Sequence, residues 1–314
     1  MSMPNNPCRI TKEDFLKEEV LCGYKVTTEM KKVFVKMIDI LEEVKRICTK
    51  YDITYVVSGG SLLGAVRHKG FIPWDDDIDI AMFRKDYDRF IEVAQKELPP
   101  HLFLQTSLTD CRNIRYARII DETTSALLPY LTDYESFCAQ GVLIDIFPMD
   151  GVISNVIKAR FQNWLANLCG SIYAYAHLLN PPQGILRKIK GWIYKRIYFI
   201  LGHKRFYAFR ENIFRRYSPK KCGKCGLISF FGNSPCTNVA TKYFEDTIEV
   251  PFEYTTVRIP RDYDPVLRQQ YGDWNVLRPG TQNRPPCEMV FDLNESYKDK
   301  ILRQYGKKPA SLVR

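Results

Sequence analysis

The 314-residue sequence lacks the features that mark several large protein classes. It has no uncharged apolar run of the roughly 18 to 20 residues that a membrane-spanning helix needs. It also has no Gly-X-Y period, no sustained heptad and no repeat at a period of about 20 to 50 residues. These absences exclude collagen, long coiled coils and repeat arrays, and they leave one large globular domain or two ordinary ones.

The amino terminus lacks the basic and then apolar pattern of a secretory leader, so we expect the chain to stay in the cytoplasm. The ten cysteines agree with this location if most of them are reduced thiols, because dense disulfide frameworks are typical of short secreted chains. Most are scattered singly, and the only cluster is formed by Cys222, Cys225 and Cys236.

The composition favours a folded protein with a sizeable core. Apolar residues make up 45% of the chain and aromatic residues 13%, which is too many for a disordered chain. The 46 Lys and Arg residues exceed the 36 Asp and Glu residues, which gives a net charge of +10. This excess indicates an anionic partner, such as a nucleotide or a membrane surface, or it serves solubility alone.

The spacing of apolar residues predicts an α/β (α+β) fold. Helices are expected over residues 29–50, 62–67 and 86–97, and strands over residues 51–57, 77–82, 115–120, 142–147 and 256–259. Composition becomes aromatic, basic and helical after residue 151 and returns to mixed character near residue 220. We therefore expect a core over residues 1–151, a helical insertion over 152–220, and a C-terminal part over 221–314 that completes the core.

The most informative segment is the acidic stretch that leads into the strand at 77–82. Asp77 and Asp79 are two residues apart, so a strand would point both side chains to the same face. Asp75 would point to that face as well if the extended conformation already begins at Asp75. Such carboxylates repel one another, and a divalent ion such as Mg²⁺ or Mn²⁺ would remove that cost. The alternative is a solvated acidic edge.

A second acid, Asp145, lies between Ile144 and Ile146 in the strand predicted at 142–147. A lone charge in a core strand is costly to bury, so Asp145 needs a partner. It would either join Asp77 and Asp79 as a third carboxylate or pair with an arginine as plain structure.

The segment Ser58-Gly59-Gly60-Ser61 connects a predicted strand to a predicted helix. Glycines there let backbone N–H groups approach a phosphate, and the start of a helix favours an anion. The alternative is an ordinary tight turn.

The whole stretch of residues 58–80 resembles the LicD family, which is part of the nucleotidyltransferase superfamily. The resemblance continues through residues 142–151 and through Tyr271-Gly272-Asp273-Trp274. Many LicD proteins carry a histidine after this last segment, whereas in this sequence no histidine follows His203. It implies a nucleotidyltransferase-like mixed sheet with flanking helices, a helical insertion and a C-terminal cap that completes the acceptor site. It also implies transfer of a phospho-alcohol, most often phosphocholine from CDP-choline, to a sugar hydroxyl of a cell-surface glycan precursor.

The resemblance assigns expected roles to individual residues. The metal-binding and catalytic set would be Asp77, Asp79 and Asp145, with Asp75 as a further ligand and Asp145 as ligand or base. Donor phosphate would be held by Ser58, Gly59, Gly60, Ser61, Arg67 and Arg118. The alternative role for Arg67 is a salt bridge to an aspartate of the same site. Trp74 and Tyr116 would stack on a base or enclose a choline, or they serve ordinary packing.

Two further features lie outside that core. Cys222, Cys225, Cys236 and Cys287 could hold a structural Zn²⁺, with free thiols and redox chemistry as alternatives. The insertion contains basic stretches with Trp and Tyr, which predict either peripheral contact with the inner face of an anionic membrane or a helix packed on the core with a solvated basic face. No nucleic-acid-binding motif is present, so no nucleic-acid partner is expected.

Two rival functions remain open from the sequence. The first is a nucleotidyltransferase that moves NMP from an NTP to a small acceptor. The second is a glycan-binding protein that kept the fold without catalysis.

Overall fold

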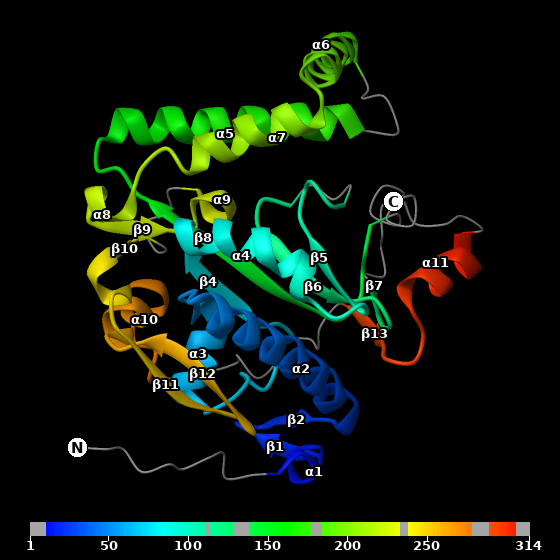
Figure 1. Cartoon of the computed structure of the whole chain (residues 1–314), viewed down its shortest axis with the longest axis vertical. Coiled ribbons are helices and arrows are strands. Elements are labelled where there is room, and N and C mark those ends of the chain that lie inside the picture. The colour runs from blue at the N-terminus through cyan, green and yellow to red at the C-terminus, as the bar shows by residue number, and fades with distance from the viewer. Residues whose placement is uncertain are drawn as a thin grey trace.

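The computed structural model describes residues 11–110, 114–127, 138–177, 184–232, 238–277 and 289–305. A twisted mixed sheet lies at the centre of the molecule, with helices packed against it, and a separate layer of helices lies at one end (Figure 1). The α/β prediction with a mixed sheet is thus confirmed.

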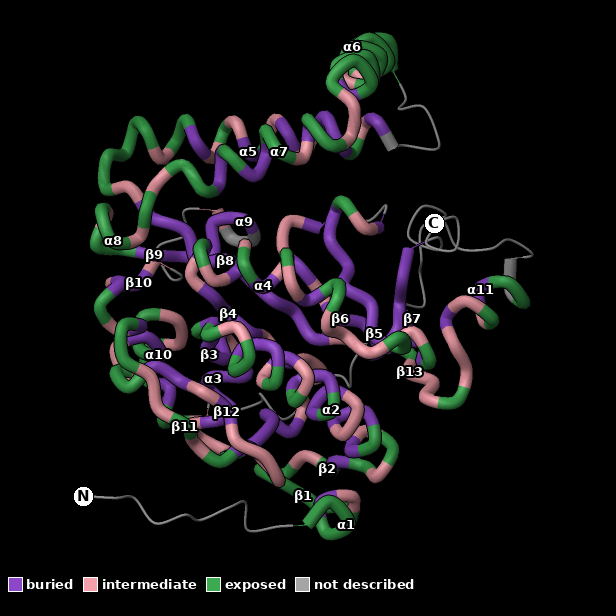
Figure 2. Tube along the Cα trace, in the orientation of Figure 1, coloured by how far each residue is buried: buried purple, intermediate pink, exposed green. Residues whose placement is uncertain are grey.

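The longest strand, β8 (Leu143–Gly151), organises the central sheet. It pairs in parallel with β4 (Asp79–Phe83) and antiparallel with β6 (Ala117–Asp121) and β9 (Lys224–Gly226). The sheet continues through β3 (Val56–Val57), β5 (Leu102–Gln105) and β10 (Val239–Ala240). Nearly all of β8 is buried, as expected for a central strand covered on both faces (Figure 2).

The two long helices of the core follow their apolar periodicity. Helix α2 (Thr28–Tyr51) is preceded by the cap residue Thr27, whose hydroxyl accepts from the Met30 N–H at 3.2 Å, and is followed by Asp52 in the left-handed conformation. Helix α4 (Arg84–Glu97) packs on α2 and on the sheet. Both helices were predicted, and their bounds differ from the prediction by one or two residues.

Three predicted boundaries were wrong. Tyr51 ends α2, and the strand predicted over 51–57 is reduced to β3. The strand predicted from residue 77 begins at Asp79, so Asp75 and Asp77 lie in the preceding loop rather than in the strand. The two glycines of the predicted turn already form the first turn of α3 (Gly59–Arg67). The left-handed cap at Asp52 sets the end of α2, and the anchored loop described below sets the start of β4.

The remaining elements are short, and most of them flank the core. They are α1 (Lys12–Phe15), β1 (Glu19–Leu21), β2 (Tyr24–Val26), β7 (Ser125–Leu127), α8 (Pro219–Cys222), α9 (Ile228–Phe231), a 3₁₀ turn (Thr241–Phe244), β11 (Thr247–Phe252), β12 (Thr255–Pro260), α10 (Tyr263–Tyr271), β13 (Val290–Asp292) and α11 (Tyr297–Tyr305).

The predicted insertion contains three long helices, α5 (Val156–His177), α6 (Ile185–Leu201) and α7 (His203–Phe214). They share a small core of their own, in which Cys169 and Tyr173 meet Phe206 and Phe214. In the described part of the chain, no helix combines the length and the apolar character needed to cross a bilayer. The division into 1–151, 152–220 and 221–314 stays a prediction, although β9 and β10 of the last range extend the central sheet.

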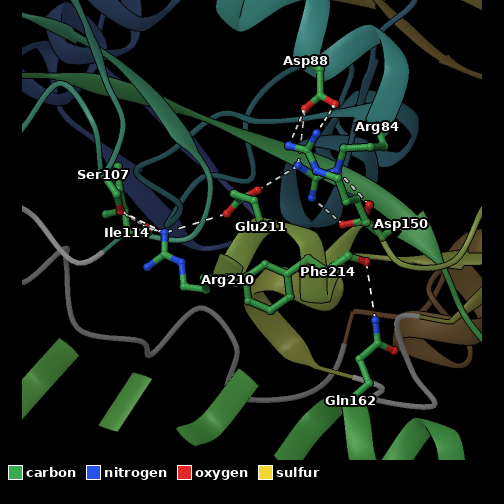
Figure 3. A network of polar contacts seen from close by, with 10 residues as sticks. Arg84, Asp88, Ser107, Ile114, Asp150, Gln162, Arg210, Glu211 and Phe214 are labelled. Carbon is green, nitrogen blue, oxygen red and sulfur yellow. Dashed lines mark hydrogen bonds and ion pairs between the residues drawn. The ribbon is translucent and has the colours of Figure 1, made fainter. Parts of the chain in front are cut away.

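Buried ion pairs fasten the helical layer to the core (Figure 3). Arg84 of α4 donates to both carboxylate oxygens of Asp150 in β8, at 2.8 and 2.5 Å, and to Glu211 of α7 at 2.9 Å. The neighbouring Arg210 donates to Ser107 Oγ at 3.0 Å and to the Ile114 carbonyl at 2.8 Å. Because Asp150 is fully buried, removing it would leave the Arg84 charge without its bidentate partner.

We therefore predict that Asp150→Ala lowers the free energy of unfolding by about 3–5 kcal/mol. Asp246→Ala removes the exposed pair with Arg261 and is the matched control, with an expected loss of at most about 1 kcal/mol. Urea unfolding followed by circular dichroism measures both. Equal losses in the two variants would show that the buried network does not hold the layers together.

Candidate active site

The loop between α3 and β4 is held in a tight arch. The Phe71 ring stacks on Phe34 at 3.9 Å, and the Phe71 N–H donates to Glu253 Oε1 at 2.9 Å. Glu253 lies at the turn between β11 and β12, and its own N–H donates to the Lys69 carbonyl at 2.7 Å. A Cβ at Gly64 would collide with the Gly70 carbonyl, so this arch requires glycine where α3 and the loop touch.

The arch presents three consecutive acids on one surface. One carboxylate oxygen from each of Asp75, Asp76 and Asp77 lies within 4.8 Å of the others. Within the described ranges, this is the only group of three His, Cys, Asp or Glu residues that are so close. The prediction named Asp75 and Asp77 but not Asp76, because a regular strand would have turned Asp76 to the opposite face.

Asp79 and Asp145 lie side by side on the adjacent parallel strands β4 and β8, where they are register partners. The Asp145 N–H donates to the Ile78 carbonyl at 2.9 Å, which extends the pairing by one step. The flanking residues Ile78, Ile80, Ile144 and Ile146 are completely buried. The apolar neighbours therefore fix the strand faces, and the expected proximity of Asp145 to Asp79 is present.

Asp145 also has the arginine partner that the sequence left as an alternative. Arg118 lies opposite it in the antiparallel β6–β8 register and donates through Nε to Asp145 Oδ1 at 2.7 Å. A terminal nitrogen of the same guanidinium donates to the Tyr116 hydroxyl at 2.7 Å, and the Tyr116 ring packs 4.5 Å from Phe147. Asp145 thus has both an acidic neighbour and a basic partner. Direct contact of Arg118 or Tyr116 with a donor stays a prediction.

The site carries more negative charge than its arginine can balance. Burial, together with Asp75, Asp76 and Asp145, raises the pKa of Asp77 to about 8, and Arg118 opposes this shift. Burial and the neighbouring Asp77, Asp145 and Asp75 likewise raise the pKa of Asp79 well above its usual range. The carboxylates therefore favour any species that brings positive charge, either protons or a cation.

The first turn of α3 lies directly against these acids. The Ser58 N–H donates to the Asp79 carbonyl, and Ser61 Oγ accepts from the Asp79 N–H, both at 2.9 Å. Gly59 has a φ of +55°, and a Cβ there would lie 3.0 Å from Asp79 Oδ2. A Cβ at Gly60 would lie 2.5 Å from Asp75 Oδ2. The Ser58 side chain makes no capping bond, so the helix begins with a polar edge beside the carboxylates.

Two other predicted residues lie at the margin of this surface. Arg67 donates to His68 Nε2 at 2.9 Å and to the Trp274 carbonyl at 3.3 Å, so neither partner is the aspartate that the salt-bridge alternative required. Burial and the nearby Arg67 lower the pKa of His68 to about 4, which keeps its ring neutral and able to accept. Trp74 meets Tyr24 and His68 edge-on, at 6.0 and 6.4 Å between ring centroids.

A cavity of about 1010 Å³ opens beside the acids. Trp74, Asp75 and Asp76 line it together with Tyr24 and Phe291. An aromatic wall next to carboxylates suits a cation or a flat ring.

Sequence reasoning missed two residues that build the site. Tyr271 in α10 places its hydroxyl 4.0 Å from the position of a Cβ at Gly59, although its segment had been noted only as part of the resemblance. Glu253 anchors the loop from a hairpin that lies far along the chain. The only signal for Glu253 was its position between two strand-like segments.

The predicted zinc site is described only in part. Cys222 in α8 and Cys225 in β9 are free thiols, and burial raises the pKa of the Cys225 thiol to about 12. Cys236 and Cys287 lie outside the described residues, so a four-cysteine zinc site stays a prediction.

Comparison with known proteins agrees with this geometry. Residues 52–155, which contain α3, β4 and the whole of β8, match the family model described as "LicD/FKTN/FKRP, nucleotidyltransferase domain". The chain carries a LicD-family domain. The acidic surface and the glycine turn both lie within it.

Relatives of the LicD-family domain include named transferases. The chain is 29% identical over 263 residues to "Lipopolysaccharide cholinephosphotransferase LicD" of Haemophilus influenzae, which covers 79% of this chain and 92% of that protein. It is 50% identical over 34 residues to "Ribitol 5-phosphate transferase FKRP" of Homo sapiens, which covers 11% of this chain and 7% of that protein. An uncharacterized protein of Rickettsia typhi is 41% identical over 54 residues, which is 17% of this chain and 18% of that protein.

The two glycines of α3 give contrasting predictions. Gly64→Ala places a methyl group against the backbone of Gly70, which cannot easily move, and should lower the free energy of unfolding by about 1–3 kcal/mol. Gly60→Ala meets only the end of the Asp75 side chain, which can rotate away, so its loss should stay below about 1 kcal/mol. Thermal unfolding compares the two variants. A larger loss for Gly60→Ala would contradict the packing of the arch.

The loop anchor should make stability depend on pH. Burial raises the pKa of Glu253 to about 7, so between pH 4.5 and 7 the folded protein keeps a proton that the unfolded chain has released. Stability should therefore fall as pH rises through this window. Glu253→Gln keeps the acceptor for Phe71 N–H without the charge, and should be more stable than the parent at pH 8 by about 1–3 kcal/mol. Urea unfolding at pH 5 and pH 8 measures the difference, and an equal effect at both pH values would contradict it.

Proposed function

We propose that this protein is a phosphotransferase that moves a phospho-alcohol from a CDP-activated donor to a sugar hydroxyl of a glycan. The observation that carries the proposal is the pair Asp79 and Asp145, held side by side against the glycine turn of α3. Two named relatives with different alcohols, choline phosphate and ribitol 5-phosphate, support the shared reaction class. Phosphocholine is our first choice, because the cholinephosphotransferase aligns over 92% of its length.

The acidic surface fits Mg²⁺ or Mn²⁺. Such ions prefer carboxylate oxygens, and a cation here would offset the burial and the acid–acid repulsion that raise the pKa values of Asp77 and Asp79. Asp75, Asp77, Asp79 and Asp145 would hold the ion, with Asp76 close enough to contribute. A bound ion would supply Lewis-acid stabilisation of phosphate charge.

The residues of the chain have distinct proposed roles. The N–H groups of Gly59, Gly60 and Ser61 would donate to a donor phosphate at the start of α3. Asp145, oriented by Arg118, would accept the proton of the sugar hydroxyl. The sugar oxygen would bond to the phosphorus that carries the alcohol as the pyrophosphate bond breaks, and CMP would leave.

The place of the reaction is also part of the proposal. In the part of the chain that the structure describes, the free thiols include Cys22, Cys48, Cys169, Cys222 and Cys225. Free thiols are typical of a reducing compartment, which supports a cytoplasmic site. The acceptor would be a glycan precursor, by analogy with the lipopolysaccharide named for the Haemophilus protein.

A second candidate is transfer of NMP from an NTP, which the nucleotidyltransferase description of the matching family model favours. The two reactions leave different products. A direct test incubates the full chain with Mg²⁺, lipopolysaccharide and CDP-choline, CDP-glycerol or CDP-ribitol, and measures CMP. We expect CMP release with CDP-choline as the best donor. Pyrophosphate release from an NTP, with no CMP from any of the three donors, would favour the second candidate.

All three carboxylates should matter for turnover, and those of Asp77 and Asp79 should not be needed for folding. Asp77→Asn, Asp79→Asn and Asp145→Asn should each lower kcat/KM for the preferred donor at least about 100-fold, the size expected when one electrostatic contribution is removed. Asp79→Asn should nevertheless unfold at the same or a higher temperature without metal, because it relieves repulsion. Asp246→Asn, an exposed acid outside the site, is the control and should keep full activity. Full activity in all three site variants would favour a non-catalytic glycan-binding protein.

A further inference from the structure

Helix α6 is the outermost element of the helical layer (Figure 1), and among the described elements it packs mainly along α5 and α7. Of its 17 residues, only Tyr198 is buried, and nearly the whole helix is exposed in Figure 2. Tyr194 and Tyr198, one helical turn apart, face the layer, with their rings 5.6 Å from Tyr175 and 5.7 Å from Tyr173. The opposite side of α6 has no such contact with the rest of the described chain.

That opposite side is mostly apolar, with Arg196 lying between Trp192 and Ile200 at four-residue spacing. We call it the α6 outer face, and its members recur at three- and four-residue spacing along the helix. Trp192 is 63% exposed and Ile200 is 79% exposed, which is unusual for side chains of this size. The α6 outer face consists of Ile185, Ile189, Trp192, Ile193, Ile197 and Ile200.

The charges around this face have a single sign. The sequence contains no Asp or Glu between residues 151 and 210, whereas α6 itself carries Arg187, Lys188, Lys190, Lys195 and Arg196. The Arg196 guanidinium lies 5.5 Å from the Trp192 ring, and the Lys190 ammonium lies 5.2 Å from the Tyr194 ring. Positive charge thus accompanies the apolar side chains, within the face at Arg196 and beside it at the lysines, which complements a surface that is apolar inside and anionic outside.

Helix α5 carries a second exposed apolar stripe near its start. Ile157, Phe161 and Trp164 are spaced by four and three residues, and the Phe161 and Trp164 rings stack at 5.8 Å. Lys158 and Arg160 lie beside them. The same combination of apolar, aromatic and basic side chains therefore occurs on two helices of one layer.

We propose that the α6 outer face docks on an anionic lipid bilayer, with the helix lying in the interface and its Lys and Arg side chains contacting lipid phosphates. Basic amphipathic helices with Trp and Phe bind bilayers in this way. A second copy of this chain is a poorer occupant, because two α6 outer faces would bring like charges together. The proposal does not depend on the catalytic function, since α6 contributes no residue to the acidic site.

Vesicle sedimentation of the full chain tests the proposal. We expect binding to vesicles of phosphatidylcholine with about one-third phosphatidylglycerol, little binding to phosphatidylcholine alone, and weaker binding as ionic strength rises. Ile189→Ser/Trp192→Ser and Lys188→Glu/Lys195→Glu should each reduce partition into the anionic vesicles at least about tenfold. Both pairs are exposed, so circular dichroism should show unchanged folding.

Matched controls change equally exposed residues elsewhere. Val20→Ser/Leu302→Ser removes exposed apolar side chains, and Lys17→Glu/Lys32→Glu reverses exposed charges, and both should bind like the parent. Equal binding by the α6 variants and the parent, or no binding to anionic vesicles, would overturn the proposal. A dimer that forms without vesicles and is lost in Ile189→Ser/Trp192→Ser would also overturn it, because the face would then be an interface between copies.

Discussion

Repulsion between carboxylates is the constraint on which the rest of the structure depends. Asp77, Asp79 and Asp145 are crowded at the start of two central strands, with Asp75 and Asp76 next to them, and the Arg118 guanidinium is paired with Asp145. Such a cluster costs stability in the free protein. A fold tolerates this loss of stability where function needs the carboxylates close together. The strands and loops that carry the carboxylates must then be held in place by other contacts.

The supporting contacts come from distant parts of the chain. Strand β8 carries Asp145 near one end and Asp150 near the other, so the strand that presents the acid also binds Arg84 and, through it, the helical layer. Glu253 holds the arch that carries the acidic loop, and the glycines of α3 let the backbone approach the carboxylates. The acidic surface is therefore anchored by several distant elements, which suits the proposed placement of phosphate and metal.

The sequence was most informative where local pattern and burial agree. Asp79 and Asp145 were predicted to meet because each is flanked by isoleucines, and a buried strand leaves an acid few positions to occupy. The strand starts were predicted less well, because the arch, and not local propensity, decides where β4 begins. Contacts such as Arg84 with Glu211, or Phe71 with Glu253, join residues 127 and 182 positions apart and leave no periodic signal. The exposed face of α6 was visible as composition, but only the fold showed which side of the helix is left uncovered.

The most direct test of the central claim is a Mn²⁺ titration of the full chain followed by electron paramagnetic resonance. We predict that the parent binds the ion at the acidic surface and that Asp79→Asn and Asp145→Asn each weaken binding at least about tenfold, while Asp246→Asn binds like the parent. Unchanged Mn²⁺ affinity in both site variants would contradict the account, because the crowded carboxylates would then have no cation to hold.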